Sequence, residues 1–193
     1  MRNWALATAI LPLALAGCVS FGEDPPAQLL TLTPSSVAPA GAATDGPVRE
    51  ALAVLEPTAP QALDVTRVPV QVDASGVAYL KDAVWVEKPA RLFQRLLAET
   101  IRARSGRLVV DMGDLQYAAA TRLSGQLLAM GYDTAQGGVV VRYDAMLVQA
   151  DGTVRTQRFE QTVPGVPARA AAVGPALNQA ANALAVEVAD WAR

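Results

Sequence analysis

Residues 85–106 read Trp-Val-Glu-Lys-Pro-Ala-Arg-Leu-Phe-Gln-Arg-Leu-Leu-Ala-Glu-Thr-Ile-Arg-Ala-Arg-Ser-Gly, and this stretch predicts the clearest helix of the chain. Pro89 suits a first helical turn, where its missing N–H costs nothing, and Glu87 complements the helix dipole. One face repeats at the spacing i, i+1, i+4, i+5, and it consists of Leu92, Phe93, Leu96, Leu97, Thr100 and Ile101. Gly106 is a suitable C-terminal cap. We therefore expect a helix over about 88–104 that braces the hydrophobic core.

A second long helix is predicted over residues 168–192, where alanines and larger apolar residues keep a helical period. Short apolar runs predict strands at 28–33, 51–55, 63–72, 77–80, 83–86, 107–111, 121–128, 139–149 and 153–163. The turn signals at 137–138 and 151–152 make the last three runs an antiparallel meander. The expected fold is α+β, with a mostly antiparallel, mixed sheet packed against the two helices.

Two segments carry further expectations. Pro69 has no N–H for a strand ladder, so 63–72 is expected to be an edge or bulged strand that could accept a partner strand. Residues 34–47 are rich in Pro, Ala, Gly and Ser, which predicts a mobile surface loop.

The N-terminal segment has a positive start, an apolar run from Trp4 to Leu15 and small residues before Cys18. This layout is that of a secretory signal peptide. The ending Leu15-Ala16-Gly17-Cys18 resembles the bacterial lipobox, which implies acylation of Cys18 and removal of residues 1–17. The alternatives are a plain signal peptide and a membrane anchor, although twelve apolar residues fall short of the roughly 20 that span a bilayer.

The predicted organisation is therefore a signal peptide over 1–17, a lipidated tether over 18–27 and a single periplasmic domain over 28–193. About eight residues of this tether reach only roughly 25–30 Å when extended, which keeps the domain near its membrane. Val19 stands where many enteric lipoproteins carry an aspartate as an inner-membrane retention signal. By resemblance to that rule, Val19 indicates the outer membrane.

Composition excludes several classes of function. The 193 residues contain no histidine and one cysteine, and the formal charge is −2. Usual Ser-His-Asp and Cys-His catalysis is thereby excluded, as is the commonest ligand of transition metals. The balance of charges also does not suit non-specific binding of nucleic acid, which needs many Lys and Arg contacts to phosphate. We expect no catalytic residues, no metal and no cofactor.

Large aromatic side chains leave two interpretations open. Tyr79 and Trp85 fit a hydrophobic core, where large aromatics are usually buried. They also fit a contact patch for a partner, together with Leu80 and the edge around Pro69, because Tyr and Trp are enriched at interface hot spots. The partner-binding set predicted on the second interpretation is Pro69, Tyr79, Leu80 and Trp85.

A family resemblance rests on four short motifs. Val68-Pro69, Tyr79-Leu80, the step Trp85-Val86-Glu87-Lys88-Pro89 and the following helix resemble the ABC-type transport auxiliary lipoproteins. The resemblance implies an outer-membrane component of an intermembrane transporter of phospholipid or another hydrophobic solute. It would work with an ABC permease and ATPase and would dock a mammalian-cell-entry (MCE) domain protein. A ring-shaped homo-oligomer is also implied.

Three other functions compete with this docking role. The domain could itself bind an acyl chain as a lipid-binding module, or it could be a structural envelope lipoprotein that contacts peptidoglycan. A hydrolase is the remaining alternative, and detectable turnover without added partners would support it.

Overall fold

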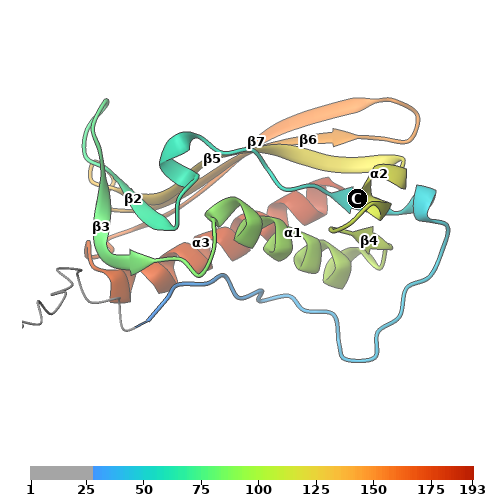
Figure 1. The fold of residues 1–193 in the computed structure, drawn as a ribbon, viewed down its shortest axis with the longest axis horizontal. Coiled ribbons are helices and arrows are strands. Elements are labelled where there is room, and N and C mark those ends of the chain that lie inside the picture. Colours follow the sequence, from blue (N-terminus) through green and yellow to red (C-terminus); the bar gives the residue numbers. More distant parts are fainter. Residues whose placement is uncertain (1–27) are drawn as a thin grey trace, which may run out of the picture.

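The computed structural model describes residues 28–193, so Cys18 and the predicted signal peptide and tether lie outside the described residues. In this part of the chain the structure is α+β, as predicted (Figure 1). The helices are α1 (Pro89–Ser105), α2 (Leu115–Ala118) and α3 (Ala170–Trp191), with short 3₁₀ turns η1 (Val48–Glu50) and η2 (Gln61–Leu63). The strands are β1 (Leu52–Val54), β2 (Arg67–Gln71), β3 (Val77–Val84), β4 (Val109–Val110), β5 (Thr121–Asp133), β6 (Gly138–Val148) and β7 (Val154–Pro164).

Within the described residues, seven strands form one mixed sheet around the long strand β5. One edge of β5 pairs with β6, which pairs with β7, and these three strands form the predicted antiparallel meander. The other edge of β5 pairs in parallel with β1 at one end and with β2 at the other. β4 extends the sheet beyond β1, and β3 extends it beyond β2.

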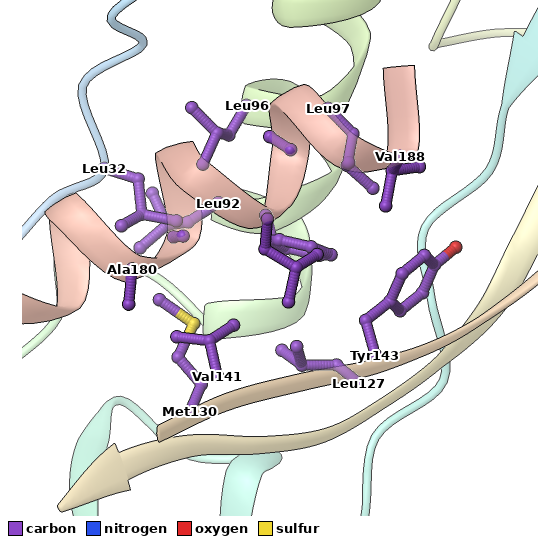
Figure 2. Close-up of a cluster of buried hydrophobic side chains, with 14 of the residues drawn as sticks. Leu32, Leu92, Leu96, Leu97, Leu127, Met130, Val141, Tyr143, Ala180 and Val188 are labelled. Atoms are coloured by element: carbon purple, nitrogen blue, oxygen red, sulfur yellow. The ribbon is translucent and has the colours of Figure 1, made fainter. Parts of the chain in front are cut away.

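Helices α1 and α3 cover one face of this sheet and form the core with it (Figure 1). Figure 2 shows side chains from α1, α3, β5 and β6 meeting between the layers. In this core Phe93 and Tyr143 are in edge-to-face contact, with 5.2 Å between their ring centroids. The face predicted for the first helix is buried along its whole length. Gly106 caps α1 in the left-handed conformation, at φ 64°, as predicted. Burial of each large apolar side chain contributes about 1.5–3 kcal/mol before conformational entropy is subtracted.

Residues 28–47, which we call the N-terminal strap, run across the outer side of the helices (Figure 1). The predicted strand at 28–33 makes a single bridge, between Leu30 and Trp85, and is not part of the seven-stranded sheet. The segment predicted as a mobile loop is mostly exposed, but side chains of the helices accept hydrogen bonds from its backbone. Asn182 accepts from Ser35 at 2.7 Å and Glu99 accepts from Ala38 at 2.9 Å. The strap is therefore attached to the helix layer over about half its length.

The prediction of an edge strand at 63–72 is wrong. β2 lies between β3 and β5, and β3 is the strand at that edge of the sheet. The bulge is confirmed, because the pairing of β2 with β3 changes register between Arg67 and Pro69. Strand β5 comes so close to Pro69 that a side chain on Gly131 would collide with its carbonyl oxygen. The missing N–H of Pro69 is therefore tolerated at a bulge and not at a free edge.

Three further details differ from the sequence predictions. The runs 77–80 and 83–86 form one continuous strand up to Val84, bent at Asp82, which has a positive φ of 58°. The short helix α2 was not predicted, and β5 extends five residues past its predicted end at 128. Ion pairs also join α1 to residues outside it, because Glu87 pairs with Arg95 and Glu56 pairs with Arg91.

Candidate partner-binding surfaces

The predicted residues Pro69 and Tyr79 lie opposite each other on neighbouring strands β2 and β3. The Tyr79 ring is half-buried under the Arg67 guanidinium, whose carbon lies 4.0 Å from the ring centroid. Its hydroxyl donates to the carbonyl oxygen of Ala62 at 3.4 Å. Tyr79 therefore joins the β2–β3 hairpin to η2, and only part of its ring remains available to a partner.

Trp85 belongs to the core, so the interpretation of its side chain as a contact patch is wrong. Its side chain is 1% exposed, and its backbone N–H donates to Thr66 at 2.7 Å. The indole Nε1 is buried without a hydrogen-bond partner among the described residues. Leu80 is half-buried and packs against the same core. Of the four predicted residues, Pro69 and Tyr79 are therefore the two that neighbour each other at the surface.

The face of the sheet turned away from α1 and α3, which we call the open face, contains a cleft of about 420 Å³. Pro69 lines one wall, η2 lines another through Ala62, and β5 and β6 supply Ala129 and Val140. Arg142 and Asp133 add polar groups. The cleft therefore combines an apolar lining with a few charged groups, as sites for amphipathic ligands often do.

Ion pairs between β6 and β7 also occupy the open face. Arg158 donates two hydrogen bonds to Asp144, at 2.6 and 2.7 Å, and Arg142 pairs with Glu160. The hydrogen bond from Arg158 lowers the pKa of Asp144. These cross-strand pairs neutralise one another, which leaves this part of the open face without a strong field of one sign.

Sequence reasoning missed the most exposed apolar group of the described residues. Met112, Leu115 and Tyr117 are 71%, 58% and 72% exposed and lie within six residues around α2. The sequence feature that could have revealed them is the presence of three large apolar residues in the turn that follows β4, where polar residues are expected. We call these three residues the distal apolar tip. Three exposed large apolar side chains in one short segment indicate an interaction site.

The described residues contain no grouping of acidic side chains that could bind a metal ion, and none of their helices is long and apolar enough to cross a bilayer. The largest pKa shift concerns Tyr143, where burial raises the pKa of the phenol. Its hydroxyl donates to the carbonyl oxygen of Ser124 at 2.7 Å, which is a structural role inside the core.

The fold places this protein in the class of two-layer α+β modules. One layer is the mixed sheet, and the other is the pair of long helices with the N-terminal strap across them. The chain belongs to the family of ABC-type transport auxiliary lipoprotein components, whose family model matches residues 30–189. The resemblance read from the sequence is thereby confirmed. It also makes the chain an auxiliary component of an ABC-type transport system.

Solved structures share the fold. A Xanthomonas campestris protein of the DUF330 family superposes with a TM-score of 0.64 at 19% identity, covering 86% of this chain and 91% of that one. A second crystal structure, of an uncharacterised protein, gives a TM-score of 0.64 at 12% identity, with 86% and 100% covered. No curated protein sequence matches the chain.

Proposed function

We propose that this chain is a non-enzymatic lipoprotein, acylated at Cys18, that holds a docking domain at the outer membrane for intermembrane transport of phospholipid or another hydrophobic solute. Its partners are an MCE-domain protein that bridges the periplasm and an ABC permease with its ATPase. The observation that carries the proposal is the match of residues 30–189 to an auxiliary transport lipoprotein family, downstream of a lipobox-like Leu15-Ala16-Gly17-Cys18.

The attachment of the strap supports a docking role near a membrane. The described chain begins at one end of the long axis, where Leu30 packs against Gly174 in the first turns of α3 (Figure 1). A tether over 18–27 therefore leads into the domain at a single fixed point. About eight residues of extended tether reach roughly 30 Å at most, so a lipid on Cys18 keeps that end close to the bilayer.

Acylation is tested by Cys18→Ser in the full chain. The wild type should incorporate labelled palmitate and sediment with outer membranes, whereas the variant should be a folded protein in the soluble periplasmic fraction. A variant that stays on the membrane, with a wild type that takes up no palmitate, contradicts the proposal. Val19→Asp is the matched control for location, because it keeps the lipid and should move the protein to the inner membrane in an enteric host.

The transport role is tested by binding. Purified lipidated protein should bind the MCE-domain protein of the same cell, and deletion of this chain should increase sensitivity to detergents in the way that loss of the MCE-domain protein does. Sedimentation with peptidoglycan alone, without binding to an MCE-domain protein, would support the structural-lipoprotein alternative instead.

The open-face cleft favours one second candidate, a lipid-binding module. A volume of about 420 Å³ lined by Pro69, Ala129 and Val140 suits part of an acyl chain. Native mass spectrometry of the Cys18→Ser protein would then show bound phospholipid. Ala129→Trp, which fills the cleft from β5, should remove that lipid, and an unchanged spectrum would contradict this candidate.

A further inference from the structure

The distal apolar tip lies at the opposite end of the domain from the point where the tether enters. Leu30 contacts α3 at Gly174, and α3 then runs to Trp191. These 17 residues of helix span roughly 25 Å, at 1.5 Å per residue. Arg107, just before β4, donates to the carbonyl oxygen of Ala192, which places β4 and the following α2 beyond that far end of α3. Figure 1 shows the same arrangement, with α2, β4 and the C-terminus opposite the start of the described chain.

The tip is attached firmly to the sheet, although its large side chains point away from it. Ala119, directly after α2, is 3% exposed and packs with Ala51 and Ala53 in a small cluster on the open face. The backbone N–H of Ala120 donates to Arg49 at 3.0 Å. The small alanine side chains anchor α2, so the exposure of Met112, Leu115 and Tyr117 does not result from a detached segment.

The charges around the tip indicate which kind of surface would cover it. Residues 108–121 contain Asp111 and Asp114 and no Lys or Arg. Two arginines of α1 share a hollow with Met112 and Tyr117, but both are paired with a carboxylate, Arg91 with Glu56 and Arg95 with Glu87. Segments that insert into anionic membrane surfaces carry Lys and Arg beside their apolar residues, so the tip lacks the electrostatic part of a membrane anchor. Met and Tyr are enriched in the cores of protein–protein interfaces.

From its position and chemistry we infer that the distal apolar tip is the surface through which this domain binds its periplasmic protein partner. The tip would contact an apolar patch on that partner. The inference rests on the proposed function, because lipidation at Cys18 is what turns the opposite end toward the membrane. The occupant is a protein and not the bilayer. The three side chains fill the centre of the contact, and Asp114 lies at its rim.

The test uses lipidated full-length protein in vesicles of phosphatidylethanolamine and phosphatidylglycerol, with the purified MCE-domain protein of the same cell as the probe. The double variant Met112→Asp with Tyr117→Asp should weaken binding by about tenfold or more, because burying a new carboxylate at an interface centre is strongly unfavourable. The matched control is Val37→Asp with Val86→Asp, one residue in the N-terminal strap and one just after β3. Those valines are 60% and 49% exposed, and the control should leave binding unchanged.

Each result has a defined meaning. Wild-type binding that the tip variant does not weaken overturns the inference and leaves the proposed function intact. If the wild-type protein does not bind the MCE-domain protein, that partner in the proposed function is wrong, and the docking role of the tip is excluded with it. A second measurement avoids charged substitutions: Tyr117→p-benzoylphenylalanine should give a photo-crosslink to the MCE-domain protein. A crosslink to phospholipid would show that the tip contacts the bilayer, which also overturns the inference.

Discussion

Asn182 of α3 holds the backbone of Thr33 in the N-terminal strap, donating from Nδ2 to the Thr33 carbonyl oxygen at 2.9 Å. The same side chain accepts from the N–H of Ser35 at 2.7 Å. One asparagine thus satisfies both a donor and an acceptor of an extended segment that has no strand neighbour there. Asn178, one turn earlier, accepts from the N–H of Thr33 at 2.8 Å. The strap, which follows the predicted tether in the chain, is therefore fixed to the longest helix.

Replacing this asparagine should loosen the strap. Asn182 is 8% exposed, so Asn182→Ala leaves polar backbone groups of the strap with weaker partners and should destabilise the protein by about 1–3 kcal/mol. Urea denaturation measures the loss. Limited proteolysis should show faster cleavage within 34–47, because a detached strap is accessible to protease.

The matched control is Gln179→Ala, which changes a more exposed side chain on the same helix. It should shift the urea midpoint little and leave proteolysis unchanged. If Asn182→Ala has no larger effect than this control, the strap is not held by the asparagine contacts.

A second prediction concerns Gly125 in β5, where the strand comes close to β6. Its φ is 153°, and a Cβ there would lie 2.0 Å from the carbonyl oxygen of Asp144 on β6. Gly125→Ala should therefore push β5 and β6 apart and cost about 1–3 kcal/mol or more, as overpacking does. Thermal unfolding at constant pH measures the effect.

Gly46 supplies the control for this substitution. It lies in the strap, its φ is not positive, and a Cβ added there would have no other atom within 4 Å. Gly46→Ala should change stability by less than about 0.5 kcal/mol. Equal melting temperatures for the two alanine variants would contradict the close approach of β5 to β6.

The parts of the fold that sequence predicted are those encoded locally. Helix α1 carries its own periodicity, first-turn proline and C-terminal glycine, and each of these acts within a few residues. The meander of β5, β6 and β7 follows from two turns that lie beside the strands they connect. Long-range pairing has no such signal. The placement of β2 between β3 and β5 depends on the bulge at Pro69 and on the absence of a side chain at Gly131.

The candidate site residues likewise include features that local sequence predicts and features that depend on distant parts of the chain. Tyr79 and Trp85 have similar sequence surroundings, yet one is half-buried beside Arg67 and the other is 1% exposed. What separates them is the bend at Asp82, whose positive φ changes the face on which the following residues lie. The exposure of Tyr117 depends on the packing of Ala119, which follows α2, against Ala51 and Ala53 at the distant strand β1, and no local pattern in 111–118 predicts that packing.

The core position of Phe93 gives a third prediction. Its ring is fully buried and meets Tyr143 edge-to-face, so Phe93→Ala should cost about 3–5 kcal/mol through lost burial and the cavity left behind. Tyr117→Ala removes another large aromatic side chain, but one that is 72% exposed, and should change stability by less than about 0.5 kcal/mol. Urea denaturation of both variants measures the two losses of stability. A large loss in Tyr117→Ala would show that the tip is part of the core and would remove it as a docking surface.

The ion pair between Asp144 and Arg158 makes stability depend on pH in a defined direction. Arg158 lowers the pKa of Asp144 below its ordinary value of 3.8, so the folded protein holds this carboxylate more strongly ionised than the unfolded chain does. The resulting stability is fully present above the unfolded pKa and is lost as the pH falls through the folded one. Both side chains are substantially exposed, at 38% and 63%, so water screens the pair and keeps its contribution small.

Asp144→Asn should therefore lower the urea midpoint slightly at pH 7, and most of the difference from the wild type should vanish once the pH falls below the folded pKa of Asp144, because protonation of the wild-type carboxyl removes the same ion pair. Asp45→Asn, in the exposed part of the strap, tests for a general effect of net charge and should change the midpoint little at either pH. A difference between Asp144→Asn and the wild type that persists undiminished in acid would mean that the Asp144 side chain acts through its shape and hydrogen bonds, and that its charge contributes nothing to folding.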